Sequence, residues 1–574
     1  MEYSELVAVY RRLEGTDSTL EKTELLADSF AEADETHLPV VISLCRGKLS
    51  PAWRSEELGV STNLTKAAIT KATGIDEDRL EDWWRETGDL GNAAAAAVTD
   101  REQTTLVSET LDVLTIAETL RELATYEGEG SQERRVDAIA KLLSNADPDE
   151  ARYVVRTVVG AMRLGVGEGT VRDAIAEAFL DGSDAAIEAV ERAHQVTNDF
   201  PLVAETARDA GVDGLGDLDV ELFRPIKVML AQKAEDVAHG LEEVADRRAD
   251  VLLEYKYDGI RAQIHRKGDR IEVYTRRLED VTEQFPDVVE ATADHLAGEE
   301  FVVEGEIVGY DPETGRPVPF QQLSQRVKRK YDIDEMREEL PVVVHLFDVI
   351  YADGESLLDE PLDDRLAALD DLLDPEPHAI ERARHRRPGE ADGPRETGGR
   401  DGAEAAVESF YEDALEAGHE GVMAKNLAAA YQPGTRVGYM MKLKPTMEPL
   451  DLVVSRAKWS EGRRSDWLGR VYLACRDPET GELLEVGRMA TGFTDEELQA
   501  VTERLEPLIR ETDGREVDVE PGVVLEVEYE EIQSSPEYGS GYALRFPRFR
   551  RFRDDIGLED VDTLDRVESL YESQ

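Results

Sequence analysis

Apolar residues recur at helical spacing throughout residues 1–217. The stretch ARYVVRTVVGAMRLGVGEGTVRDAIAEAF shows this period, and the alanine run at 93–97 adds a preference for helix over strand. A passage rich in turn residues, DAGVDGLGDLDVELFRPIKVMLA, then interrupts the pattern and is typical of a domain boundary. The pattern predicts an all-helical N-terminal domain over residues 1–217.

The period changes over residues 218–447. Short β-rich runs follow one another between Gly, Asp and Pro, and segments such as PLDDRLAALDDLL keep a helical period. The β-rich runs are VLLEYKY, RAQIHRKG, RIEVYTRR, EFVVEGEIVGY, LPVVVHLFDVIYADG and YMMKLK. We predict an α+β domain built on antiparallel sheets. Residues 374–402 are polar, rich in Pro and Gly and without period, which predicts a mobile surface insertion.

Strands recur at short intervals over residues 448–574. The runs PLDLVVSRAKW, GRVYLACRD, LLEVGRMATGF, VVLEVEYEEIQ and ALRFPRFRRFR are separated by one helical segment, DEELQAVTERLEPLIRE. About five strands with an inserted helix are typical of a small β-barrel such as an oligonucleotide-binding (OB) fold. The whole chain is therefore predicted to have three domains, at 1–217, 218–447 and 448–574.

The charge balance adds a prediction about the environment. The chain carries 126 acidic and 66 basic residues, a net charge of −60, and its basic residues are 15 lysines and 51 arginines. The acids are spread among apolar positions, which argues against a disordered acidic protein. We predict a surface adapted to molar salt, where the Debye length falls to about 3 Å and self-repulsion is screened.

Several classes of protein are excluded. The two cysteines, Cys45 and Cys475, cannot form a disulfide framework or a Cys-rich zinc module, and the nine histidines show no metal-binding spacing. We find no apolar run of about 18 residues and no signal peptide at the N-terminus. A cytoplasmic monomer without membrane contact is expected.

Chemistry is concentrated around Lys256 in EYKYDGIR. A lysine that attacks phosphorus must be neutral, and at an ordinary pKa of about 10.4 only about 1 in 2,500 is neutral at pH 7. The site must lower that pKa through burial or nearby cations, and Arg261 could supply such a cation. Gly259 permits a close turn. Taken alone, the short pattern is equally compatible with a solvated lysine in a turn.

An ordered set of further motifs follows Lys256. KYDGIR, YTRRLEDVT, FVVEGEIVG, VHLFDVIYADG, EGVMAKN and MMKLKP extend over about 190 residues. The set resembles the covalent nucleotidyltransferase superfamily and is most similar to archaeal ATP-dependent DNA ligases, of a haloarchaeal type. The resemblance implies an all-α DNA-binding domain, a nucleotidyltransferase (adenylation) domain and a C-terminal OB-fold barrel. It also implies nick sealing in double-stranded DNA during replication, recombination and repair, through a lysyl-AMP and an adenylated 5′-phosphate.

The resemblance implies a role for each matching residue. Lys256 would carry AMP, Phe347 would stack on adenine, and Glu306 and Glu420 would hold Mg²⁺ or Mn²⁺. The other nucleotide contacts, including ribose and phosphate, would be Glu254, Arg261, Arg276, Glu306, Arg436, Lys442 and Lys444. Without the resemblance, Phe347 would be a core residue, and Glu306 and Glu420 would be solvated acids. The family usually has Asp where this chain has Glu304.

Two further segments are ambiguous. The family's closing Arg-x-Asp-Lys-like element matches at Arg553, Asp554 and Asp555, but Ile556 stands at the lysine position. Either an arginine among Arg548, Arg550, Arg551 and Arg553 substitutes, or self-adenylation is less efficient. The glycines of RLGVGEGT (Gly165, Gly167 and Gly169) lead into a helix, either as a DNA-phosphate site or as a helix–helix turn.

Alternatives stay open at this point. They are an RNA ligase or another nucleotidyltransferase, and a non-catalytic DNA-binding scaffold on a ligase fold. The nucleotide donor, ATP against ADP or another, and a sliding-clamp partner are also open. Because electrostatic binding to DNA weakens steeply with salt, we hypothesise that DNA is held by encirclement, helix N-termini and arginine clusters such as residues 545–553.

Overall fold

The computed structural model describes residues 1–54, 58–101, 109–234, 237–245, 247–327, 329, 331–388, 400–445, 447–460, 464, 466–490 and 492–573. The chain splits into two compact units, Met1–Lys444 and Pro445–Gln574, which are described separately. Among the described residues, helices both long and apolar enough to cross a membrane are absent.

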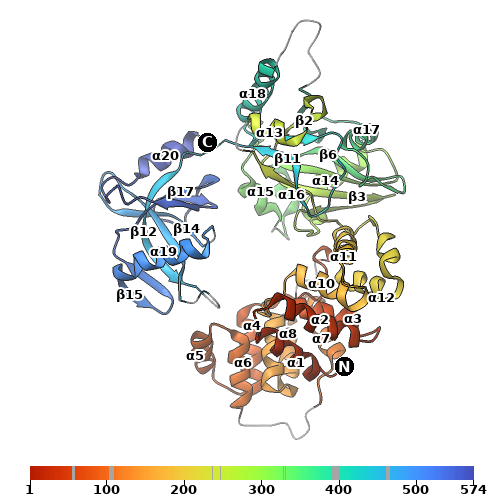
Figure 1. Ribbon diagram of the computed structural model, residues 1–574, viewed down its shortest axis with the longest axis vertical. Helices are drawn as coiled ribbons and strands as arrows, with labels where there is room; N and C mark the ends of the chain where they lie inside the picture. Colours follow the sequence, from red (N-terminus) through yellow and green to blue (C-terminus); the bar gives the residue numbers. More distant parts are fainter. Residues whose placement is uncertain are drawn as a thin grey trace. The chain divides into compact units, whose positions relative to one another are not determined.

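The first half of the larger unit is helical, as predicted (Figure 1). Its helices are α1 (Tyr3–Glu14), α2 (Thr19–Glu32), α3 (Leu38–Arg46), α4 (Thr62–Thr73), α5 (Glu77–Thr87), α6 (Leu90–Thr99), α7 (Val113–Ala124), α8 (Ser131–Asn145), α9 (Pro148–Val158), α10 (Glu168–Phe179), α11 (Asp184–Thr197) and α12 (Phe200–Gly216). Ser and Asp side chains cap many of their N-termini, for example Ser18, Asp147 and Ser183. The apolar faces pack into one core that extends from Tyr3 to Leu215.

Two sheets form the second half of the larger unit. Their strands are β1 (Leu230–Lys233), β2 (Val251–Lys256), β3 (Ile260–Lys267), β4 (Arg270–Thr275), β5 (Glu300–Gly309), β6 (Val342–Ala352), β7 (Glu355–Ser356), β8 (Ile380–Arg382), β9 (His385–Arg386), β10 (Gly421–Asn426) and β11 (Arg436–Leu443). One sheet has the order β1-β11-β10-β2-β9, and the other has the order β4-β3-β5-β6-β7 with β8 beside β6. Pairing is antiparallel except for β1 with β11 and β6 with β8.

Helices cover the outer faces of these sheets. They are α13 (Val237–Val244), α14 (Pro286–His295), α15 (Phe320–Val327), α16 (Ile333–Glu339), α17 (Leu362–Leu372) and α18 (Arg400–Glu416). One core joins β2, β10 and β11 to α13 and α18, and a second joins β3, β5 and β6 to α14, α15 and α17 (Figure 1). The α+β prediction is confirmed in these elements.

The insertion predicted over 374–402 is partly regular structure. β8 pairs in parallel with β6, β9 pairs with β2, and α18 begins at Arg400. Residues 389–399 lie outside the described residues. The prediction was wrong at the flanks because strands of two and three residues carry no detectable period.

The smaller unit is a β domain with two helices. Its elements are β12 (Leu450–Trp459), β13 (Leu468–Arg476), β14 (Leu483–Met489), α19 (Asp495–Leu505), β15 (Ile509–Asp513), β16 (Glu516–Val519), β17 (Val524–Glu528), β18 (Glu531–Ser534), β19 (Tyr542–Arg545), β20 (Arg548–Phe552) and α20 (Leu564–Ser573). Strands β12 to β17 and β20 form one sheet, and β18 pairs with β19. The pairing among the described residues leaves this sheet open, so the predicted closed barrel is not confirmed.

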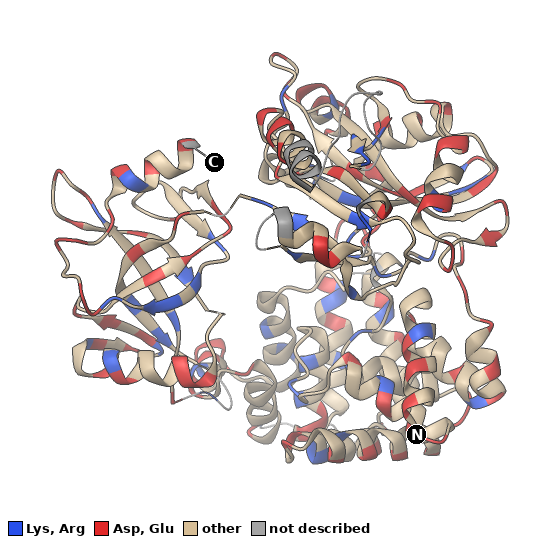
Figure 2. Ribbon diagram, turned by 45° about the horizontal axis from the view of Figure 1, so that its top comes forward, with Lys and Arg blue, Asp and Glu red and all other residues tan. Residues whose placement is uncertain are grey.

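Acidic residues are distributed over both units (Figure 2). They lie on helices and strands alike, and many pair with an arginine or lysine, for example Asp149 with Arg11 at 3.0 Å and Glu485 with Arg456 at 2.7 Å. Exposed pairs of this kind contribute only about 0–1 kcal/mol each. They therefore reduce repulsion more than they stabilise the fold.

Candidate active site

Lys256 is the last residue of β2, and the turn Tyr257–Gly259 leads directly into β3. Its carbonyl accepts a hydrogen bond of 2.9 Å from the amide N–H of Glu420, just before β10. Gly259 makes the turn possible, because a Cβ there would lie 2.4 Å from the carbonyl oxygen of Ile307 on β5. The turn thus holds Lys256 where β2, β5 and β10 meet.

The Lys256 ammonium is surrounded by acids. It forms an ion pair with Glu420, which also pairs with Lys444 at 2.7 Å. Burial opposes the charged form of Lys256, but Glu420 and Glu306 outweigh it, so the pKa of Lys256 is raised. The expectation that burial and Arg261 lower this pKa is therefore wrong for this structure.

Glu306 faces the same group from β5. It lies opposite Arg261 on β3 and opposite His345 on β6. Burial raises its pKa to about 7, although Lys256 and Arg261 pull that pKa down. Near neutral pH this carboxyl is thus poised between its charged and neutral forms.

Arg261 is committed to Glu304 and not to Lys256. Its guanidinium donates to Glu304 at 2.6 Å and to the carbonyl of Met229 at 2.7 Å. Glu304 is fully buried and also accepts hydrogen bonds from Gln263 at 2.9 Å and Tyr431 at 3.0 Å. The glutamate that replaces the family's usual aspartate therefore has three donors, which accounts for its place in the site.

Phe347 owes its orientation to a β-bulge. Glu304 pairs with Asp348 and the next residue, Gly305, pairs with Leu346, so Phe347 is the extra residue on β6. Bulges re-aim a side chain next to a site. The ring is only partly buried, with the Arg261 guanidinium 5.3 Å and the Lys425 ammonium 4.5 Å from its centroid. This ring is not a fully buried core residue.

Glu254 is held in a buried ion pair. It is 2% exposed, pairs with Lys425 and lies 3.7 Å from Arg382. Sequence reasoning gave no role to either partner. Lys425 stands in the quoted EGVMAKN motif and could have been singled out, whereas Arg382 lies in the predicted insertion and had no signal.

The remaining predicted cations come from both sheets, Arg276 from the turn after β4 and the others from β11 and the residues that follow it. Arg276 is exposed, and its pKa is lowered by partial burial and by the nearby Arg261 and Arg436. Arg436 begins β11 and donates to the carbonyl of Ala231. Lys442 lies near the end of β11, and Lys444 follows two residues later with its contact to Glu420. All the residues predicted to bind nucleotide therefore lie in the larger unit, and Lys256, Glu306, Glu420 and Lys444 lie together in it.

The C-terminal element lies in the smaller unit. Arg553 pairs with Asp451 and Asp555, and Asp554 pairs with Arg504. Ile556 is partly buried against the cluster of Val453, Ala474, Val524 and Val561. An apolar residue therefore suits the packing at this position, where the family pattern has lysine.

The glycine-rich segment before α10 serves as a helix–helix connection. Gly167 is the N-cap of α10 without a side-chain capping bond, and Gly165 has φ +63°. Glu168 in the first turn contacts Arg46 at 3.4 Å and Lys227 at 2.6 Å. These contacts support the interpretation of this segment as a helix–helix turn. The N-terminus of α10, which has no side-chain cap, is also compatible with a phosphate.

The chain matches three family models in order. Residues 2–176 match "DNA ligase N terminus", residues 228–444 match "ATP dependent DNA ligase domain", and residues 464–556 match "ATP dependent DNA ligase C terminal region". A DNA ligase of Thermococcus onnurineus (strain NA1) is 43% identical over 574 residues, which cover 100% of this chain and 98% of that protein. A DNA ligase of Methanothermobacter thermautotrophicus is 43% identical over 571 residues, with 100% and 98% covered.

A solved structure agrees at the level of fold. The protein named Pmar-Lig_PreS3 superposes with a TM-score of 0.57 at 17% identity and covers 96% of this chain and 99% of its own. The order of the three models and the identity over the full length decide the assignment. The chain belongs to the ATP-dependent DNA ligase family.

Proposed function

We propose that this chain seals nicks in double-stranded DNA through an adenylate carried on Lys256. The observation that carries the proposal is the position of Lys256 at the end of β2, between Glu306, Glu420 and Lys444. In the first step Nζ attacks the α-phosphate of ATP, a P–N bond forms and pyrophosphate leaves. AMP then passes to the 5′-phosphate, and attack by the 3′-hydroxyl joins the strands and releases AMP.

Lys256 must lose its proton before it attacks. Its ion pair with Glu420 favours the charged form, so the reactive form requires that Glu420 or Glu306 be neutralised. Glu306, with a pKa of about 7, can change its charge near neutral pH. Lys444 already balances part of the charge of Glu420.

The donor set fits a hard divalent cation. Among the described residues there is no cluster of three or more metal-ligating side chains, and Mg²⁺ is usually held by one or two carboxylates together with substrate phosphates. Glu306 and Glu420 would hold Mg²⁺ or Mn²⁺, which when bound supplies positive charge to the phosphoryl oxygens. Arg436, Lys442 and Lys444 would share the triphosphate charge.

The nucleotide would lie along the bulged strand. Phe347 offers a partly exposed ring for adenine, with the Arg261 guanidinium 5.3 Å from its centroid, and Glu254 and Arg276 would supply further nucleotide contacts. The paired state of Glu254 with Lys425 keeps its carboxylate oriented. We extend the proposal to ATP as the donor.

Features of the whole chain support further parts of the proposal. The net charge of −60 supports a haloarchaeal type adapted to molar salt, and the strand pattern of residues 448–574 supports an OB-type fold.

The arginine cluster of the smaller unit is already paired with acids of the same unit. Its members are Arg545, Arg550, Arg551 and Arg553. This cluster is therefore less available to DNA than its sequence suggests. The three domain boundaries, the monomeric and cytoplasmic state and a sliding-clamp partner stay predictions.

Transfer of label from α-labelled ATP tests the nucleophile. Lys256→Ala should abolish the covalent adenylate. The matched control is Lys267→Ala, because Lys267 lies on β3 and pairs at the surface with Glu300 at 2.9 Å; it should label normally. A covalent adenylate in the Lys256→Ala protein would refute the assignment. Normal folding with no adenylate in the unsubstituted protein would favour the non-catalytic scaffold.

A further inference from the structure

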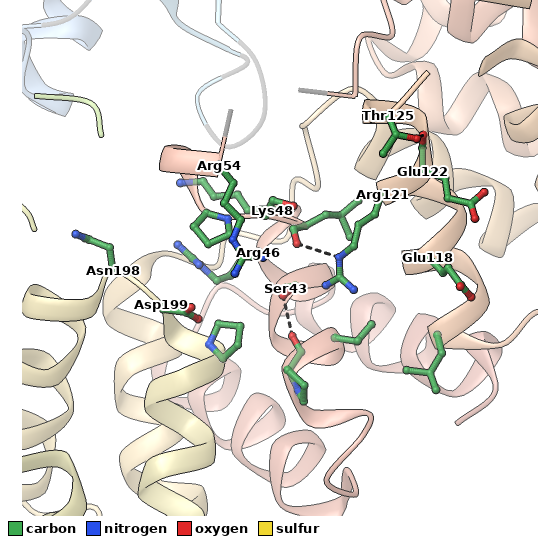
Figure 3. A pocket seen from close by; sticks show the side chains of 17 residues that line it. Ser43, Arg46, Lys48, Arg54, Glu118, Arg121, Glu122, Thr125, Asn198 and Asp199 are labelled. Atoms are coloured by element: carbon green, nitrogen blue, oxygen red, sulfur yellow. Dashed lines mark hydrogen bonds between the residues drawn. The ribbon is translucent and has the colours of Figure 1, made fainter. Parts of the chain in front are cut away.

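A pocket in the helical part collects cationic side chains. It is formed by α3 and the loop that follows it, by α7 and by the start of α12 (Figure 3). The charged side chains of its lining are Arg46, Lys48, Arg54, Arg121, Glu118, Glu122 and Asp199. Four cations thus meet three acids, whereas the chain as a whole has 66 basic and 126 acidic residues. The local charge balance is opposite in sign to that of the chain.

The positive charge of this pocket is only partly neutralised, because Arg46 pairs with Glu168 at 3.4 Å while the other three cations pair with no acid among the described residues. Among the described residues, Lys48 and Arg54 form neither an ion pair nor a side-chain hydrogen bond. Arg121 donates Nε to the carbonyl of Leu49 at 3.3 Å, which leaves its charge without a carboxylate. By contrast, the ammonium of Lys66 on α4 forms an ion pair with Glu81 at 2.8 Å. Partial burial of its ammonium and, to a smaller extent, the neighbouring Arg46 lower the pKa of Lys48, and Glu168 partly opposes this shift.

The acids of the lining do not cancel this charge. Asp199 is engaged as the N-cap of α12, where it accepts from the amide of Leu202 at 3.1 Å. Glu118 and Glu122 are exposed and one turn apart on α7. Figure 3 shows Lys48 and Arg54 on the loop that follows α3 and the two glutamates on α7. An anion could therefore contact the loop without displacing an existing ion pair of Lys48 or Arg54.

The uncharged part of the lining mixes apolar and polar side chains. Pro39, Leu49, Pro51, Leu114 and Pro201 contribute apolar carbons, and Ser43, Ser50, Thr125 and Asn198 contribute polar groups. A wall that combines cations with apolar carbons suits a phosphodiester, because its phosphate is charged and the adjoining sugar offers apolar surface.

We propose that this pocket binds a backbone phosphate of duplex DNA, with Lys48 and Arg54 as its direct contacts. The inference rests on the proposed DNA substrate and assigns one place where the helical part holds it. A backbone contact fixes position without reading sequence.

A charge-matched pair of variants tests the proposal. The pocket variant is Lys48→Gln/Arg54→Gln, and the control is Arg12→Gln/Lys141→Gln, whose side chains are exposed on α1 and α8 and outside the pocket lining. Binding of a nicked duplex with a 5′-phosphate is measured by fluorescence anisotropy over a range of KCl. The pocket variant should bind about tenfold more weakly, and its slope of log Kd against log KCl should fall by about 1. The control should stay within about twofold.

Adenylation separates this proposal from the proposed function. Label transfer from ATP needs no DNA, so both variants should adenylate at the rate of the unsubstituted protein. Absence of adenylation in the unsubstituted protein would count against the proposed function and leave the pocket to be judged by binding alone. If the pocket variant and the control lost DNA affinity equally, or if neither lost it, the proposed phosphate site would be refuted.

A second measurement uses the unsubstituted protein. Lys48 is exposed, so an amine-acetylating reagent should modify it, and mass spectrometry reports the extent. Nicked DNA should protect Lys48 severalfold, and Lys141 should stay reactive. Inorganic phosphate at matched ionic strength should protect Lys48 much less. Equal protection by inorganic phosphate and DNA would mean a site for free anions and would overturn the proposed DNA contact.

Discussion

Replacement of Glu304 by glutamine should be among the most damaging single changes in the larger unit. The carboxylate is fully buried and compensates the Arg261 guanidinium at 2.6 Å, with further hydrogen bonds from Gln263 and Tyr431. Removing one partner of a buried pair costs about 3–5 kcal/mol, because the other charge is left uncompensated. The amide group of glutamine would also turn an N–H donor either toward Arg261 or toward Gln263 and Tyr431, because only one of its two terminal atoms accepts.

The control for this change lies on the same two strands. Glu300→Gln removes the partner of Lys267, whose side chain is 60% exposed, so the loss should stay below about 1 kcal/mol. Hydrogen exchange of the β3 and β5 amides reports the difference locally. The expected 3–5 kcal/mol corresponds to about 150- to 4,000-fold faster exchange in Glu304→Gln. Similar exchange in the two variants would show that Arg261 finds another partner and would refute the reasoning.

Three other outcomes are expected. Because the pKa of Lys256 is raised and only its neutral form attacks, the rate of self-adenylation should rise with pH between 6 and 9, and a flat profile would contradict this. Gly259→Ala should unfold or strongly destabilise the larger unit, since its Cβ would lie 2.4 Å from the Ile307 carbonyl oxygen. Gly438→Ala, whose nearest neighbour would be Gln232 at 3.7 Å, should retain most of the thermal stability, and equal losses would argue against the close contact. Ile556→Lys should lower the free energy of unfolding of the smaller unit by about 1 kcal/mol or more, because a charge would enter an apolar cluster. The melting temperature should therefore fall, and an unchanged melting temperature would contradict that packing argument.

Periodicity was sufficient to predict the main elements. The helical first half falls where the pattern indicated because its helices bury regular apolar faces, and β2 to β6 and β11 fall on the short β-rich runs between turn residues. Strands β8 and β9 were missed, since pairing with distant β6 and β2 creates them. The hairpin of β15 and β16 was also missed. Its first residues continue the apparent helical period of α19 beyond Pro507.

The family resemblance selected Lys256, Glu306, Phe347, Glu420 and Lys444 from the order of the motifs, and their roles stay predictions. The ion pairs of the site could not be predicted. The pairing of Lys256 with Glu420 and of Arg261 with Glu304 depends on cross-strand register, which no local pattern encodes. For this reason the direction of the Lys256 pKa shift was predicted wrongly.

The bulge at Phe347 has a consequence for which mutations the site can accept. Successive residues of a strand face opposite sides of a sheet, and β6 absorbs one extra residue at Phe347 and another at Ile350. Deleting Phe347 would restore regular pairing of β6 with β5 and leave the apolar side chains on both sides of the bulge on their present faces. The strand can thus lose this one residue and still pair, whereas a deletion in a stretch of β6 without a bulge would shift the register.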